Sequence, residues 1–219
     1  MSPYRERYHR DLKELKNLTK DLADKVGAAI DQSVSALKDS NADLAREVIK
    51  NDQEMDDLSL KIENLCMELL ALQQPMAKDL RRIIGILKIG IDLERIGDLA
   101  VDVARVTVQS QNKIQITKLE FIPRMAEIAK KMLDQTMTAL MNSDPDMARQ
   151  VTKWDYEIDS LYVKARDKLL KIIIERPEVI AEGTALLMVN RHLERTGDHI
   201  CNICETIVYM VEAKREHLN

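Results

Sequence analysis

The chain has 219 residues, a formal net charge of −4, and 45% hydrophobic and 32% charged residues. This balance is typical of a soluble globular protein, and it excludes a global basic field that would draw the chain onto nucleic acid. Aromatic residues make up only 3%, with six glycines and five prolines, which favours long helices over a β-sandwich or barrel.

The first predicted helix spans residues 5–38, where leucine, valine and alanine recur at spacings of three and four. Asp39–Asn41 then ends this helix and supplies side chains that can cap the next one. Asp144 and Pro145 mark the equivalent break later in the chain, as a cap and a first helical residue. Further helices are predicted at 42–73, 76–109, 118–141, 145–175 and 179–215.

Helices of about 30 residues joined by short turns predict an all-α fold of antiparallel three-helix bundles. Residues 1–109 are assigned to the first bundle and 118–219 to the second, with 110–117 as a linker that lacks helical periodicity. The two bundles are expected to be pseudo-symmetric, because the chain contains an internal repeat. Leu93–Asp98 (LERIGD) returns as Leu193–Asp198 (LERTGD), and 36–56 aligns without a gap over 139–159 with 11 of 21 identities.

Carboxylates are the residue type most consistently kept in both copies. At about 100° per residue, Glu94 and Asp98 fall within the apolar stripe of the third predicted helix. Two residues four positions apart project from one helix face, about 6 Å from each other. Four such acidic pairs occur, two in each half: Asp52 and Asp56, Glu94 and Asp98, Asp155 and Asp159, and Glu194 and Asp198.

If the helices of each half are neighbours, four carboxylates converge, which is unfavourable without a counter-ion. We therefore expect a cluster of cations in each half. Oxygen ligands suit iron, manganese, magnesium or calcium, and zinc is also compatible. The alternative is that these acids are solvated or pair with arginine and lysine along their own helices.

Glycines, cysteines, histidines and a basic group outside the acidic pairs also lead to predictions. Gly97 and Gly197 indicate either a close approach of another group or plain helix packing, since a mid-helix glycine costs about 1 kcal/mol relative to alanine. Cys201 and Cys204, with Cys66, are interpreted as reduced core residues of a cytoplasmic protein, not as a zinc or redox motif. We expect His199 not to be a ligand, His192 to be exposed and Trp154 to be a packing residue. The basic group Lys78, Arg81 and Arg82 is expected to be solvated, or to touch a partner or an anionic membrane surface.

These motifs resemble the PhoU family of phosphate-signalling proteins. The resemblance covers nearly the whole chain: the Asp/Glu-x-x-x-Asp pairs, Leu-Glu-Arg-x-Gly-Asp in each half, and Gln74-Pro75 followed by Asp79–Arg81. It implies two three-helix bundles with multinuclear metal clusters, iron above all, held by the eight acids named above. One departure is that Asp102, which extends the first acidic row, is matched by Asn202.

The resemblance also implies a function. PhoU-like proteins negatively regulate high-affinity phosphate uptake and its two-component signalling, at the membrane face between a phosphate ABC transporter, through its ATPase subunit, and a sensor histidine kinase. They form homodimers, associate peripherally with the inner face of the membrane, and have no established catalysis. Two alternatives stay open: a helical adaptor without metal, and a di-iron enzyme. The enzyme is disfavoured because glycine follows Glu94 and Glu194 three positions on, where that chemistry expects histidine.

Overall fold

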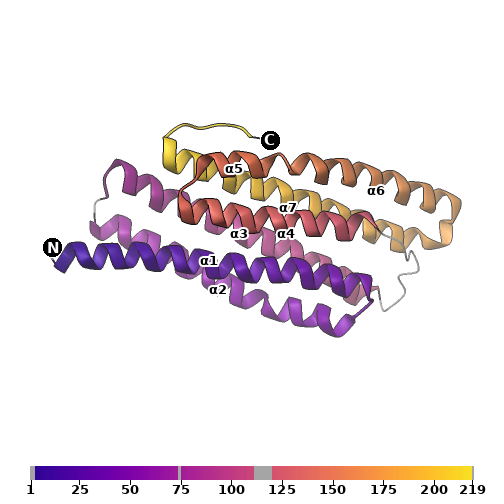
Figure 1. Ribbon diagram of the computed structural model, residues 1–219. Coiled ribbons are helices and arrows are strands. Elements are labelled where there is room, and N and C mark those ends of the chain that lie inside the picture. Colours follow the sequence, from indigo (N-terminus) through magenta and orange to yellow (C-terminus); the bar gives the residue numbers. More distant parts are fainter. Residues whose placement is uncertain (1–2, 74, 111–119, 219) are drawn as a thin grey trace.

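The computed structural model describes the chain apart from residues 1–2, 74, 111–119 and 219 (Figure 1). The described residues form helices and no strand, which confirms the predicted all-α class with six long helices. The elements are α1 (Pro3–Lys38), α2 (Ala42–Gln73), α3 (Ala77–Gln109), α4 (Phe121–Asn142), α5 (Pro145–Thr152), α6 (Asp155–Glu175), the 3₁₀ turn η1 (Pro177–Val179) and α7 (Ile180–Glu212).

The predicted helix 145–175 is divided in two, and this part of the prediction was wrong. At the break the Trp154 amide donates to the carbonyl of Val151, at 3.0 Å, which is the tighter 3₁₀ pattern. The Thr152 hydroxyl also donates to a carbonyl three residues back, a bond that bends helices. The equivalent stretch of α2 is unbroken and has Ile49 where the second copy has Thr152.

The helices pack as two antiparallel groups of three rods, α1–α3 and α4–α7, with α5 and α6 forming one broken rod (Figure 1). Between the groups, α3 lies against α7 and α1 against α4. A single cluster of buried apolar side chains runs through both groups. The predicted linker 110–117 lies, except for Ser110, outside the described residues. None of the described helices combines the length and apolar character needed to cross a membrane.

Both groups begin their second rod in the same way, as the sequence predicts. The Asn41 side chain accepts a hydrogen bond from the Leu44 amide at 3.0 Å. Asp144 does the same for the Met147 amide at 2.9 Å, with Pro145 as the first helical residue. These bonds satisfy amides that have no partner within the helix, so each cap fixes where its helix starts.

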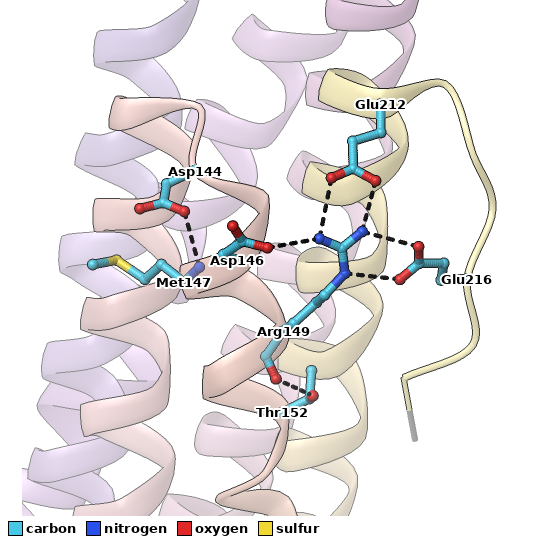
Figure 2. Close-up of polar contacts among 7 residues, drawn as sticks. All are labelled: Asp144, Asp146, Met147, Arg149, Thr152, Glu212 and Glu216. Atoms are coloured by element: carbon cyan, nitrogen blue, oxygen red, sulfur yellow. Dashed lines mark hydrogen bonds and ion pairs between the residues drawn. The ribbon is translucent and has the colours of Figure 1, made fainter.

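The C-terminal segment, residues 214–218, turns back beside α7 and is attached to α5 by Arg149 (Figures 1 and 2). The Arg149 guanidinium binds the carboxylates of Glu212, Nη2 to Oε2 2.6 Å, and of Glu216, Nε to Oε2 2.9 Å. Further along the segment, the Leu218 amide donates to Glu205 Oε1 at 2.8 Å. Arg149 also pairs with Asp146 of its own helix, and its repeat equivalent Arg46 makes the corresponding pair with Asp43.

Candidate functional site

The four acids of the first half lie on neighbouring helices, Asp52 and Asp56 on α2 and Glu94 and Asp98 on α3. Burial raises the pKa of Asp52, and the charges of Asp56 and Asp98 raise it further. The pKa of Glu94 is raised by burial, by Asp98, and more weakly by Asp56 and Asp52. The two acidic pairs therefore interact across the α2–α3 interface, with repulsion between them.

Arginines on the same helices also pair with these acids. Arg95 lies 3.1 Å from Asp98 and 3.6 Å from Glu94, and Arg191 pairs with Glu194 in the second half. The predicted alternative of ion pairs along the helix is thus present in the structure. Arg95 and Arg191 are half exposed or more, so these pairs are screened by solvent and are worth little.

The second half contains a more buried arrangement centred on Asp155, the first residue of α6. This residue is 1% exposed, and in the described structure its two buried oxygens have no partner apart from the weakly donating thiol of Cys201, which lies against the carboxylate. Burial, with the charges of Asp159 and Asp198, raises the pKa of Asp155 to about 7. The pKa values of Asp159 and Glu194 are raised as well, first by burial and then by Asp198. Glu194 Oε2 is also buried without a partner in the described structure.

Gly97 and Gly197, the glycines of the Leu-Glu-Arg-x-Gly-Asp motifs, lie against different side chains. A Cβ built on Gly197 would collide with Asp155 Oδ1, so the missing side chain is what lets this carboxylate approach α7. A Cβ on Gly97 would lie 3.2 Å from the Met55 sulfur, closer than ordinary contact, but the neighbour there is the flexible end of a side chain. Each of the two interpretations made from the sequence therefore applies to one glycine.

The buried cysteines also differ in their surroundings. Cys204 packs in the core, 3.2 Å from the Thr136 hydroxyl, as the sequence predicts. Cys201 is equally buried, but its thiol lies against the carboxylate of Asp155. A polar neighbour for this thiol was not predicted. The residues concerned are 46 positions apart in the chain, on different helices.

Two histidines depart from simple sequence reasoning. His192 was expected to be exposed, which was wrong: it is half-buried, its Nδ1 lacks a hydrogen-bond partner in the described structure, and burial lowers its pKa. The expectation failed because helix α7 faces α3 of the other half, a contact that periodicity within α7 does not reveal. His199 pairs with Asp92 of α3 at 2.9 Å, a link between the two halves that was not predicted from the sequence.

Trp154 is half-buried against the core, which confirms it as a packing residue, and the Lys131 ammonium lies 4.0 Å from its ring centroid. In the basic group, Lys78 and Arg82 line a small pocket with the ends of α4 and α7, and Arg82 lies 3.7 Å from Asp79. Lys78 and Arg82 therefore lie beside other helices of the same chain.

As the side chains stand, the described residues contain no group of three or more histidine, cysteine, aspartate or glutamate side chains that could hold a metal ion. The chemistry of the donors nevertheless fits a cation. In the second half Asp155 has two buried oxygens without partners, and the partly exposed Asp159 can rotate towards the same ion. In the first half the partly exposed Glu94 and Asp98 can rotate towards an ion of their own. A metal cluster would therefore require rotation of these side chains and release of their arginine partners.

Comparison with known proteins identifies the chain's relatives. The model of the PhoU domain matches twice, at residues 19–107 and 122–207. The chain is 33% identical to the phosphate-specific transport system accessory protein PhoU homolog of Clostridium acetobutylicum, over 97% of both proteins. It is 35% identical to the homolog of the same name from Aquifex aeolicus, over 95% of this chain and 96% of that one.

Solved structures agree with this. The crystal structure of PhoU from Pseudomonas aeruginosa superposes with a TM-score of 0.90 at 31% identity, covering 94% of this chain and 100% of that chain. The phosphate transport system regulatory protein PhoU from Streptococcus pneumoniae gives a TM-score of 0.89 at 28% identity, covering 95% and 99%. Since the match extends over both halves in sequence and in fold, the chain belongs to the PhoU family.

Proposed function

We propose that this chain is an accessory protein of a phosphate-specific transport system that restrains high-affinity phosphate uptake when phosphate is plentiful. The observation that carries this proposal is similarity over the full length. Relatives matched over almost all of their own length are named as transport accessory proteins, and a structural neighbour as a regulatory protein. These names describe accessory proteins and not enzymes, in keeping with a role exerted through contacts.

In this proposal the chain works at the inner face of the membrane as a homodimer. Its partners are the ATPase subunit of the phosphate transporter and a sensor histidine kinase. The long helices offer extended rigid surfaces for such contacts, held in place by one continuous core.

Deletion of the gene in its own host tests the regulatory role. With plentiful phosphate, transcripts of the phosphate-uptake genes should rise in the deletion strain and return to the wild-type level when the gene is restored. Phosphate-starved cultures are the control, because uptake is already induced in both strains. Uptake genes that stay repressed in the deletion strain would contradict the proposal.

We further propose that the carboxylates of each half bind cations, with iron favoured and zinc, manganese, magnesium or calcium as alternatives. Asp52, Asp56, Glu94 and Asp98 would hold ions in the first half, and Asp155, Asp159, Glu194 and Asp198 in the second. The main support is the buried Asp155, whose oxygens lack partners in the described structure. Burial raises these pKa values first and repulsion between the acids adds to it; a bound cation would neutralise that repulsion and would tie α2 to α3, and α6 to α7.

Thermal unfolding with and without metal tests the cation sites. A ligand that binds only the folded state stabilises it by mass action, so the metal-loaded protein should melt at a higher temperature than the metal-free protein. Combining Glu94→Ala with Asp98→Ala should reduce this difference, because one of the two sites is lost. If metal binding is regulatory, the same variant should leave uptake genes on in plentiful phosphate. A variant that binds no metal and still represses would favour the metal-free adaptor.

A further inference from the structure

The second half has a thiol where the first half has an aliphatic side chain. The motif repeats at an offset of 100 residues, so Cys201 is the equivalent of Val101 and Asn202 of Asp102. At 100° per residue, Cys201 lies on the same face of α7 as Glu194 and Asp198, one turn beyond Asp198. Relative to the first half, the second half has therefore lost a carboxylate from this row and gained a thiol.

Cys201 faces the most buried acid among the described residues. The thiol is 1% exposed and lies against the carboxylate of Asp155. A neutral thiol is a weak hydrogen-bond donor and compensates poorly for a buried carboxylate. Apart from this thiol, both buried Asp155 oxygens are without a hydrogen-bond partner in the described structure, so a sulfur donor and two oxygen donors lie together in a buried part of the α6–α7 contact.

The backbone holds Asp155 in this position. The absence of a Cβ at Gly197 leaves the room that the carboxylate occupies, and α6 begins anew at Asp155 after the helix break. In the first half Asp52 is only half-buried, and Gly97 faces a methionine. Of the two repeat-equivalent positions, only the one in the second half therefore has a buried carboxylate beside a thiol.

We propose that Cys201 is a metal ligand that shares a cation with Asp155, so that the second half holds a mixed sulfur and oxygen site. This inference rests on the proposed cation binding and adds a ligand that distinguishes the two halves. The thiol releases its proton to solvent as the metal–sulfur bond forms, and no change of oxidation state is involved. Thiolate is a softer ligand than carboxylate, so this site should prefer iron or zinc over magnesium or calcium.

Titration of the metal-free protein with Co²⁺ under anaerobic conditions tests the assignment. A cobalt–thiolate bond gives a charge-transfer absorption that carboxylate ligands do not give. The wild-type protein should develop this band, and Cys201→Ser should lose it. Cys204→Ser is the matched control, since Cys204 lies on the same helix, is equally buried and contacts Thr136, so its variant should keep the band. Combining Glu94→Ala with Asp98→Ala should also keep it.

The outcomes separate this inference from the proposed cation binding. Cobalt that binds without a thiolate band, or a band that survives in Cys201→Ser, overturns the role of Cys201 and leaves cation binding intact. A wild-type protein that binds neither Co²⁺ nor iron overturns both. Cys201→Ala serves as a second variant, and thermal unfolding of the metal-free variants verifies that each is folded before titration.

Discussion

At the scale of single residues, the burial of Asp155 makes the stability of the protein depend on pH. An aspartate in the unfolded chain has a pKa near 3.8, whereas burial raises the pKa of Asp155 to about 7. Between these values the unfolded chain has lost its proton and the folded chain keeps it. The unfolded state therefore binds fewer protons, and stability is full below pH 4 and falls as pH rises towards 7.

We expect the free energy of unfolding of the metal-free protein to be lower at pH 8 than at pH 5. Each pKa unit corresponds to about 1.4 kcal/mol, which after allowance for screening gives roughly 2 kcal/mol for Asp155. Asp155→Asn should remove much of this slope, as measured by urea unfolding at both pH values. Asp52→Asn, at the half-buried equivalent position, should flatten it less. An unchanged slope in Asp155→Asn would show that the buried carboxyl is already ionised or compensated.

The glycines allow a matched pair of substitutions. Gly197→Ala places a Cβ against Asp155 Oδ1 and should destabilise the protein by about 1–3 kcal/mol, as overpacking of a core does. Gly97→Ala meets the flexible end of Met55 and gains up to about 1 kcal/mol of helix propensity, so it should be close to neutral. Chemical denaturation of the two variants measures the difference. Equal effects would mean that Asp155 is not held against α7.

At the element scale, the sequence predicted helix positions well because the signals are local. Asn41 and Asp144 cap helices where their residue types and the following periodicity predict. The break before Asp155 was missed, since Val151–Trp154 contains neither proline nor glycine and the break depends on backbone and hydroxyl bonds. For the candidate site, the sequence predicted which acidic residues share a helix face and that the helices carrying them are neighbours. The buried thiol beside Asp155 depends on packing between helices, which a periodic pattern in one helix does not contain.

The attachment of the C-terminal segment to α5 should depend on Arg149. In Arg149→Met we expect faster hydrogen exchange at the Leu218 amide, which is bonded to Glu205 in the wild type. Arg46→Met is the control at the repeat-equivalent position and should leave this amide protected, because Arg46 pairs within its own helix. Equal protection in the two variants would show that the segment is held by other contacts.

The same contact should weaken in acid. Hydrogen bonds from Arg149 lower the pKa values of Glu212 and Glu216. For an acid with a lowered pKa, the stabilisation is present above its usual pKa of 4.5 and is lost as pH falls through the lowered value. Protection of the Leu218 amide, corrected for the intrinsic exchange rate, should therefore be constant near neutrality and fall below about pH 4.5. Constant protection to lower pH would contradict a role for these ion pairs.

At the scale of the whole molecule, the repeat predicts two similar units but not how they join. The structure joins them through α3 and α7, with Asp92 and His199 paired across the contact and one apolar cluster beneath. The motif helices that carry Glu94 and Glu194 are thus the same helices that form this contact. A cation bound in either half would stiffen a helix on which the other half packs.

Elemental analysis of anaerobically purified protein tests the central claim that both acid clusters bind cations. We predict bound metal in the wild type, and a partial loss per chain both when Glu94→Ala is combined with Asp98→Ala and when Glu194→Ala is combined with Asp198→Ala. Combining all four changes should remove nearly all of it, provided that circular dichroism shows each variant to be helical. A wild-type protein without stoichiometric metal, or four-fold variants that retain it, would contradict the claim.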